Sequence, residues 1–358
     1  MLSIFGISFL IGISITIIVI PLAKKFGKKF KIYDNPNTRS QHNFPLIRTG
    51  GLGIFISFFA TEILILSIFK NQFSNSLDDE KYLIVTLIGV FITMFIGIAD
   101  DVMSLSPILR LISQFILCIW IWSTGIKIEW IDMSLSSNHN YIFHLPIFLS
   151  ILITMLWIAG IINAMNWIDG LDGLATGLFC IISLSLLIIN YQNNYYYGAI
   201  TASCLFASCL GFLKFNYKPA SIIMGDSGSN FLGFTLATNA ITANNLNLDI
   251  GEENISVTRV IILFLLFAYP ILDMIRVITL RLVKKTSPIY PDRIHFHHFL
   301  YDIGLNHNLI LLFIFSVSGI FISLSFLILD YDFGKLTLLI SLIFTTFILN
   351  KIIKLKRT

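Results

Sequence analysis

Apolar runs of about 20 residues recur along the whole chain, and short polar stretches separate them. A helix of that length crosses a hydrocarbon core of about 30 Å. Because lipid offers the backbone no hydrogen-bond partners, such runs are expected to be helical. The pattern predicts about eleven membrane spans, at residues 2–22, 51–69, 82–99, 108–124, 146–163, 174–190, 197–213, 229–244, 257–280, 308–329 and 334–351.

The predicted fold class is therefore all-α: a polytopic integral membrane protein in which one membrane-embedded domain covers residues 1–358. Composition agrees, since 56% of the residues are hydrophobic and only 12% are charged. Soluble domains carry roughly 25% charged residues. The short alternating segments of a membrane β-barrel are absent from the sequence. All four cysteines lie inside apolar runs, which favours buried side chains over disulfides or zinc ligands.

Basic residues concentrate in the first loop, the ninth loop and the C-terminal tail KIIKLKRT. The first loop contains KKFGKK, and the ninth contains RLVKK. Loops on the opposite side, such as NQFSNSLDDE and NNLNLDIGEENIS, are acidic or neutral. Because Lys and Arg favour the cytoplasmic side, this bias predicts an N-terminus outside and a C-terminus in the cytoplasm. The first run has no basic residue before it, so we expect a retained span rather than a cleaved signal peptide.

Five polar motifs fall in the loops that this orientation assigns to the cytoplasm. They read IYDNPNTRSQHNFPLIRTGG, ADDVMSLSP, NAMNWIDGLDGLA, MGDSGSN and SPIYPDRIHFHH. The loops on the other side carry no comparable set of short polar residues. The distribution predicts one site, facing the cytoplasm, that several loops assemble together.

Asp100 and Asp101 end the third predicted span. Neighbouring carboxylates repel, so one of them is a candidate general base with a raised pKa. The pair is equally suited to a divalent metal ion. The alternative is a hydrated helix end at the membrane boundary.

The motif NAMNWIDGLDGLATG places Asp169 and Asp172 three residues apart, so a helical turn would put them on one face. A calcium loop of the EF-hand type is excluded, because Leu171 stands where an oxygen ligand is required. Asn163 and Asn166 add neutral oxygens, which suit magnesium or the edge of a nucleobase. The alternative is a glycine-rich helix entry that an aspartate caps.

GDSGS, residues 225–229, precedes the eighth predicted span and is compatible with two roles. Asp226 and Ser229 are suitable caps for the helix. The glycines and the exposed N–H groups of a helix start are also suitable for a phosphate cradle.

RIHFHH places Arg293, His295, His297 and His298 together. Their spacing matches no common zinc pattern, and a cationic, donor-rich cluster for phosphate or sugar hydroxyls fits at least as well.

Two further charged features lie inside predicted spans. Arg110 is expected to face an anion, either a phosphate or the aspartate pair, or to reach the membrane interface. Asp273 and Arg276 are three residues apart in the ninth span and are expected to pair with each other. Carboxylates imply a divalent metal, and cations with N–H groups imply phosphates. This combination favours phosphoryl transfer between a lipid and a cytosolic substrate.

The five motifs, in this order, resemble the polyprenyl-phosphate N-acetylhexosamine-1-phosphate transferases, the WecA/MraY superfamily of glycosyltransferase family 4. The resemblance spans nearly the whole chain. It implies that undecaprenyl phosphate attacks the β-phosphate of a UDP-N-acetylhexosamine, so that UMP leaves and a lipid diphosphate-sugar forms. It also implies magnesium, which manganese can replace, and an inner-membrane location. It implies no nucleic-acid partner and is compatible with a homodimer.

The resemblance also implies roles for individual residues. Asp100 and Asp101 would handle the lipid phosphate, one of them as its base, and Asp169 completes the catalytic set. Asp226 and Asn166 would hold magnesium. The nucleotide-sugar set is Asp172 at the uracil, Arg110 at the diphosphate, and Arg293, His295, His297, His298, Gly50 and Gly51. Direct attack is favoured over a covalent aspartyl intermediate, because a phosphate dianion is already a nucleophile.

Two departures from the peptidoglycan-precursor enzymes indicate the branch. The histidine motif is split, as HFHH, and DDVMS lacks a further aspartate. Both features resemble the WecA/TagO-like branch, which initiates O-antigen, common-antigen or teichoic-acid lipids, most often with N-acetylglucosamine-1-phosphate. The alternative is a phospho-MurNAc-pentapeptide transferase. From another class, an ion-coupled transporter would place its charges at the midplane in two related halves, and a CDP-alcohol phosphotransferase would carry a longer aspartate and AR signature.

Overall fold

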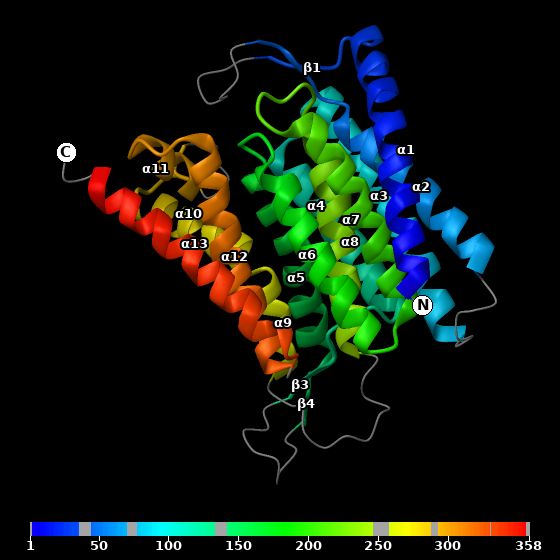
Figure 1. Ribbon diagram of the computed structural model, residues 1–358. Coiled ribbons are helices and arrows are strands. Elements are labelled where there is room, and N and C mark those ends of the chain that lie inside the picture. The colour runs from blue at the N-terminus through cyan, green and yellow to red at the C-terminus, as the bar shows by residue number, and fades with distance from the viewer. Residues whose placement is uncertain are drawn as a thin grey trace. The chain divides into compact units, whose positions relative to one another are not determined.

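The computed structural model describes residues 2–35, 44–69, 77–132, 142–245, 258–287, 293–329 and 331–355, which form helices and two short hairpins (Figure 1). The helices are α1 Leu2–Lys29, α2 Gly50–Phe69, α3 Leu77–Met103, α4 Pro107–Thr124, α5 Ile147–Ile168, α6 Leu174–Gln192, α7 Tyr196–Asn216, α8 Gly225–Asn245, α9 Thr258–Leu266, α10 Ala268–Val283, α11 Phe296–Asp302, α12 His307–Ile328 and α13 Phe333–Leu355. The strands are β1 Tyr33–Asp34, β2 Leu46–Ile47, β3 Trp130–Asp132 and β4 Ile142–His144.

The all-α, polytopic prediction is confirmed. Within the described residues, nine helices are long and apolar enough to cross a membrane: α1 to α7, α12 and α13. Each coincides with a predicted span. The hairpins, in which β1 pairs with β2 in antiparallel fashion and β3 with β4, were not predicted, because strands of two or three residues leave no periodic pattern.

The ninth predicted span, 257–280, is interrupted at Phe267 and forms α9 and α10. Pro270 lies in the first turn of α10 and has no N–H group, so it cannot donate the hydrogen bond that would continue α9 into α10. The helix restarts when the Ile271 N–H donates to the carbonyl oxygen of Phe267 at 3.0 Å. The break therefore has a local cause that the sequence contains.

The contacts divide the chain into two compact units. One contains Met1–Ile131 and Tyr141–Asn254, and the other contains Asp132–Asn140 and Ile255–Thr358. In the second unit, α12 packs against α9, α10, α11 and α13. The single domain over 1–358 stays a prediction, since this grouping does not test whether either unit folds alone.

In the first unit, α8 packs against α2, α3, α5, α6 and α7, and so lies at the centre. It is the eighth predicted span, but it is too polar to count among the nine apolar helices. Its threonines return their hydroxyl groups to their own helix, as Thr235 does to the Phe231 carbonyl at 2.6 Å. Asn239 accepts from Asn190 at 2.8 Å and donates to the Gly198 carbonyl at 3.0 Å. These polar groups therefore have hydrogen-bond partners inside the protein, so their side chains do not have to face lipid.

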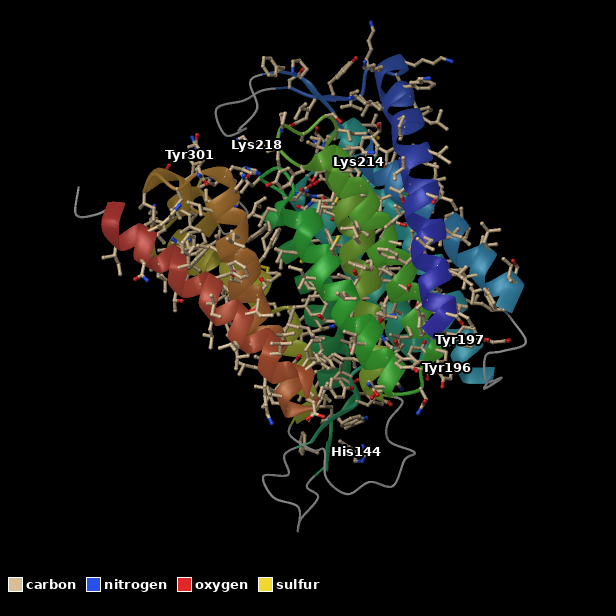
Figure 2. All side chains as sticks on the ribbon, in the orientation of Figure 1. His144, Tyr196, Tyr197, Lys214, Lys218 and Tyr301 are labelled. Carbon is tan, nitrogen blue, oxygen red and sulfur yellow. The ribbon has the colours of Figure 1, made fainter. Side chains whose placement is uncertain are left out.

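Successive helices of the first unit alternate in direction. The ends of α1, α3, α5 and α7 therefore lie near the starts of α2, α4, α6 and α8. Figure 2 places Lys214 and Lys218, at the end of α7 and just after it, at one end of this unit, and His144, Tyr196 and Tyr197 at the other. The first of these ends carries four of the five polar motifs.

Candidate active site

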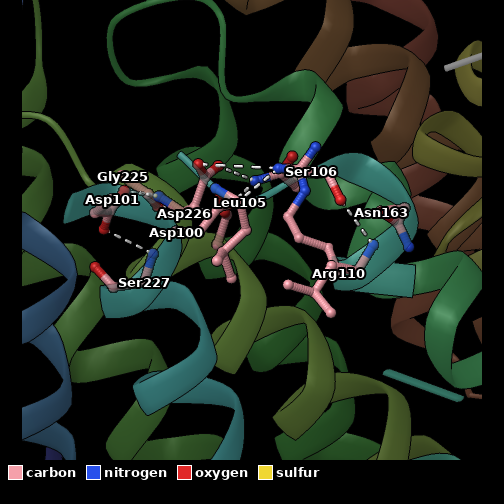
Figure 3. Close-up of polar contacts among 12 residues, drawn as sticks. Asp100, Asp101, Leu105, Ser106, Arg110, Asn163, Gly225, Asp226 and Ser227 are labelled. Carbon is pink, nitrogen blue, oxygen red and sulfur yellow. Dashed lines mark hydrogen bonds and ion pairs between the residues drawn. The ribbon is translucent and has the colours of Figure 1, made fainter. Parts of the chain in front are cut away.

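Side chains from separate segments of the chain meet at this end of the first unit (Figure 3). They are Arg48 before α2, Asp100 and Asp101 at the end of α3, Arg110 in the first turns of α4, Asn166 at the end of α5 and Asp226 at the start of α8. The motifs in this unit therefore bring their side chains together as expected, and their action as one functional site stays a prediction.

Asp101 caps α8 from another helix. Its Oδ1 accepts from the Asp226 N–H at 2.8 Å, and its Oδ2 accepts from the Ser227 N–H at 2.9 Å. Gly225, which begins α8, has φ +74, and a Cβ there would lie 2.9 Å from both Asp101 carboxylate oxygens. A negative charge at a helix N-terminus is stabilising because it faces the positive end of the helix dipole. Of the two predicted roles of GDSGS, the structure supports capping, with Asp101 as the cap instead of Asp226 or Ser229.

Asp100 contacts a different set of residues. Its Oδ1 accepts from the Leu105 N–H at 2.9 Å, which folds the turn between α3 and α4 around the carboxylate. Its Oδ2 forms an ion pair with Arg110 Nη1 at 2.8 Å. The aspartate pair was one of the two partners predicted for Arg110. The two aspartates, although adjacent in sequence, therefore accept hydrogen bonds from different backbone N–H groups and pair with different arginines.

The predicted metal ligands Asn166 and Asp226 lie together. Asn166 Nδ2 donates to Asp226 Oδ1 at 2.6 Å and to Ser229 Oγ at 2.8 Å. Asn163, one turn earlier in α5, instead donates to Gln114 Oε1 at 2.6 Å and so joins α5 to α4. Asn166 therefore lies beside Asp226, whereas Asn163 joins two helices, and the neutral-oxygen role of both asparagines stays a prediction.

Arg48 is a site residue that the sequence analysis missed. Its Nη2 lies 2.6 Å from Asp226 Oδ2, and its Nε lies 2.8 Å from Asp101 Oδ1. Asp34 lies further away, with 3.9 Å between Oδ1 and Arg48 Nη1. Burial opposes the charge of Arg48, but the surrounding carboxylates outweigh this effect and raise the pKa of the guanidinium. The available signal was a single basic residue inside the motif LIRTGG, which was read only as part of a basic loop.

Gly50 and Gly51 follow Arg48 and allow α2 to approach α8 closely. Their N–H groups donate to the carbonyl oxygens of Ile223 at 3.0 Å and Met224 at 2.8 Å. A Cβ at Gly51 would lie 2.2 Å from the backbone nitrogen of Gly228, a distance that no side chain tolerates. Packing accounts for both glycines, and their assignment to the nucleotide sugar stays a prediction.

Asp169 and Asp172 lie in a tight turn between α5 and α6, so the expected helical face is not formed. Asp172 Oδ2 accepts from the Ala220 N–H at 3.0 Å. The Asp169 carboxylate has no hydrogen bond or ion pair within the described residues. Burial, followed by the charges of Asp226, Asp101 and Asp172, raises the pKa of Asp169 to about 7, although Arg48 opposes this shift.

The histidine motif belongs to the second unit, where α10 anchors it. Asp273 Oδ2 lies 2.9 Å from His295 Nδ1, and Asp273 Oδ1 accepts from the Phe296 N–H at 2.9 Å. Arg276 Nη1 donates to the Ile294 carbonyl at 2.6 Å. The predicted pairing of Asp273 with Arg276 is therefore wrong: each residue instead fixes the start of α11.

The cationic character expected of this motif is weaker at two of its histidines. His297 and His298 are buried, with ring centroids 4.2 Å apart. Burial, together with the neighbouring His295 and Arg293, lowers the pKa of both rings below the usual value for histidine. The lowered pKa favours the neutral form of both rings, and Arg293, which is exposed, carries a permanent positive charge.

The site carries the donor types that magnesium prefers, although within the described residues no three His, Cys, Asp or Glu side chains converge as a complete metal site. Magnesium is commonly held by one or two carboxylates, and substrate phosphates supply further oxygens. Asp226 and the amide oxygen of Asn166 fit this pattern, since the amide can rotate to present either end. A multi-pass helical protein with such a site belongs to the class of membrane proteins equipped for phosphate chemistry.

Comparison with known proteins gives the family. The sequence profile of Glycosyl transferase family 4 matches residues 83–244. The chain is 32% identical over 321 residues to the probable undecaprenyl-phosphate N-acetylglucosaminyl 1-phosphate transferase of Bacillus subtilis (strain 168), covering 88% of this chain and 84% of that protein. The chain belongs to glycosyl transferase family 4, which confirms the resemblance seen in the motifs.

Two further relatives carry similar names. The decaprenyl-phosphate N-acetylglucosaminephosphotransferase of Mycobacterium tuberculosis (strain ATCC 25618 / H37Rv) is 31% identical over 300 residues, with 80% of this chain and 72% of that protein covered. The undecaprenyl-phosphate alpha-N-acetylglucosaminyl 1-phosphate transferase of Escherichia coli (strain K12) is 26% identical over 292 residues, with 79% and 72% covered. These names are those of the WecA/TagO-like branch.

Proposed function

We propose that this protein transfers N-acetylglucosamine-1-phosphate from UDP-N-acetylglucosamine to a polyprenyl phosphate, which is undecaprenyl phosphate in most bacteria. The product, a lipid diphosphate-sugar, initiates the synthesis of a cell-surface glycan. One observation carries the proposal: Asp100, Asp101, Asn166 and Asp226 come from three separate motifs and meet at one end of a group of helices that are long and apolar enough to cross a membrane. The names of relatives that align over most of the chain support it.

The reaction requires the site to manage charge. A phosphate oxygen of the lipid attacks the β-phosphorus of the nucleotide sugar, and the bond from that phosphorus to the bridging oxygen breaks. UMP leaves with the electron pair, so the step needs no oxidant or reductant. Because two phosphate-bearing substrates approach each other, positioning and charge neutralisation supply most of the rate enhancement.

Arg110 is suited to bind the phosphates. Its Nη1 is held by Asp100, which fixes the guanidinium at the helix start, and about a quarter of the side chain remains exposed. The other N–H groups of the guanidinium can then meet the diphosphate in a two-pronged geometry. Asp100 thus positions Arg110, while its role and that of Asp101 at the lipid phosphate, and that of Asp169 in catalysis, stay predictions.

Asp226 and Asn166 would hold magnesium, and manganese is a chemically close replacement. The metal would neutralise the diphosphate and stabilise the charge that develops on the departing UMP. The remaining assignments also stay predictions: Asp172 at the uracil, and Arg293, His295, His297 and His298 at the sugar and phosphate. In that role Asp172 would keep the hydrogen bond that its Oδ2 accepts from the Ala220 N–H.

The site is proposed to face the cytoplasm. We also propose eleven spans: the nine apolar helices, α8 as the tenth, and α9 together with α10 as one interrupted span. Support comes from the basic residues at the site end of the first unit. The last turns of α1 carry Lys28 and Lys29, and Figure 2 places Lys214 and Lys218 at that end as well. The positive-inside bias then leaves the N-terminus outside and the C-terminus in the cytoplasm.

The activity is tested with membranes that contain the protein. UMP release from UDP-N-acetylglucosamine is expected only when both polyprenyl phosphate and magnesium are present. Asp226→Ala is expected to lower the rate at least a hundredfold, since it removes a metal ligand, while the protein still inserts. Glu129→Gln removes a carboxylate outside the site and serves as the matched control.

Other donors discriminate the alternatives. Faster turnover with UDP-MurNAc-pentapeptide would favour the peptidoglycan-precursor enzyme, and the absence of UMP release with every nucleotide sugar would refute the enzymatic function. Full activity in Asp226→Ala would remove Asp226 from the metal site.

A further inference from the structure

Arg48 binds the same carboxylate that the metal requires. The distance from Arg48 Nη2 to Asp226 Oδ2 is 2.6 Å, which is short even for a charge-assisted hydrogen bond. The other oxygen of Asp226 accepts from Asn166. Both oxygens of Asp226 therefore already contact hydrogen-bond donors, and a divalent cation that binds Asp226 must share these oxygens with the donors or displace one of them.

The position of Arg48 is fixed from several directions. Its backbone N–H donates to the Ile32 carbonyl at 3.2 Å, and its Nε contacts Asp101, which α8 in turn holds through two N–H groups. Gly51, three residues after Arg48, packs against Ser227 and Gly228 of α8. The guanidinium is therefore placed beside the start of α8 by the fold, and it is only about a quarter exposed.

The charge of the cluster explains why a cation is needed there. Five carboxyl groups, Asp34, Asp100, Asp101, Asp169 and Asp226, surround two guanidinium groups, so the carboxyl groups of the cluster outnumber its cations by three. Arg110 contacts Asp100 and lies 4.0 Å from Asp226. Arg48 is thus the basic residue in closest contact with Asp226 among the described residues.

We propose that Arg48 is an internal competitor of the divalent cation: it pairs with Asp226 before the metal binds and releases that carboxylate as the metal enters. The inference rests on the proposed function, because it takes Asp226 as a metal ligand. Since Asp101 still holds Nε, the guanidinium stays in the site after release, where its charge faces the incoming diphosphate. The metal alone then binds weakly, and the metal together with the diphosphate binds more tightly.

The test measures Mn²⁺ binding to the full chain in nanodiscs, without substrate, by electron paramagnetic resonance of the free ion. Removing a hydrogen bond between charged groups is expected to tighten Mn²⁺ binding about tenfold in Arg48→Gln. Arg110→Gln is the matched control, because it removes the same charge at 4.0 Å from Asp226 instead of 2.6 Å. Its effect is expected to be clearly smaller.

Equal or weaker Mn²⁺ binding in Arg48→Gln would overturn the inference, as would an equal gain in Arg110→Gln. Thermal unfolding checks that each variant is folded. If Arg48→Gln does not fold, Arg48→Lys replaces it, and a smaller gain of the same sign is expected, because an ammonium group spans fewer carboxylates.

A different result would refute the proposed metal site itself. Asp226→Asn should abolish the binding in every background, so Mn²⁺ binding that persists in that variant would refute Asp226 as a ligand. Binding that is measurable only in Arg48→Gln, and is lost on adding Asp226→Asn, would support the inference.

Discussion

Asp100 and Asp101 show how two identical neighbours acquire different tasks. Successive residues of a helix point about 100° apart, so the two carboxylates at the end of α3 face different elements. Asp101 holds the start of α8, and Asp100 holds Arg110. The motif is therefore best understood as two separate anchors that together bring α3, α4 and α8 to one point.

Gly225→Ala tests the anchor at α8. The new Cβ would meet the Asp101 carboxylate at 2.9 Å, in a backbone conformation that alanine already disfavours by about 1–2 kcal/mol. The variant is expected to unfold at a lower temperature and to lose most of its transferase activity.

Gly304→Ala is the control for that variant. Gly304 also has a positive φ, +90, but a Cβ there has no atom within 4 Å. The melting temperature of Gly304→Ala is expected to fall only by the amount that the positive φ costs an alanine. Equal melting temperatures for the two variants would contradict the contact between Gly225 and Asp101.

Among the elements, the short helix α11 depends most on a neighbour. It has seven residues, too few for an isolated helix to be stable, and α10 fixes its start through Asp273 and Arg276. The histidine motif therefore owes its conformation to α10 and not to its own sequence.

Asp273→Ala is expected to free the start of α11, because the Phe296 N–H and the His295 ring lose their shared acceptor. Amide hydrogen exchange of residues 294–302 should become at least tenfold faster, with little change in α12. Asp302→Ala removes an exposed carboxylate from the same helix and should leave the exchange unchanged. Unchanged exchange in Asp273→Ala would show that other contacts hold α11.

Helices and strands were predictable from the sequence where the physical cause of the element lies in its own residues. The apolar runs predicted the membrane helices, because lipid acts on every residue of a span. The ion pair of Arg110 with Asp100 was one of two expected outcomes, because the residues are close in sequence, whereas the contact of Arg48 with Asp226 was not predictable, because it joins residues far apart in sequence. Asp101 was missed as a cap for the same reason. Motif resemblance brought Asn166 and Asp226 together as ligands, yet only the fold shows that Arg48 lies between Asp226 and Asp101.

For the whole molecule, the two ends of the first unit differ in chemistry. The aspartates and Arg48 contact one another at the site end, where Figure 2 also places Lys218, and the other end carries Tyr196, Tyr197 and His144. This polarity along the bundle axis is what the proposed orientation in the membrane rests on.

Cysteine labelling in intact cells tests that orientation. Lys218→Cys is expected to be shielded from a membrane-impermeant maleimide until the cells are opened, whereas His144→Cys should react at once. All four native cysteines are buried, so the background is expected to be low. The opposite pattern of labelling would place the site outside the cytoplasm.

The polar central helix α8 has a consequence for how the protein is made. Threonine and asparagine make a segment a poor substrate for insertion into lipid by itself. Every helix that α8 packs against, namely α2, α3, α5, α6 and α7, precedes it in the chain. Because synthesis starts at the N-terminus, these helices are already available as packing partners when α8 leaves the ribosome. Because of this order of synthesis, α8 can carry its threonines and asparagines into the bilayer.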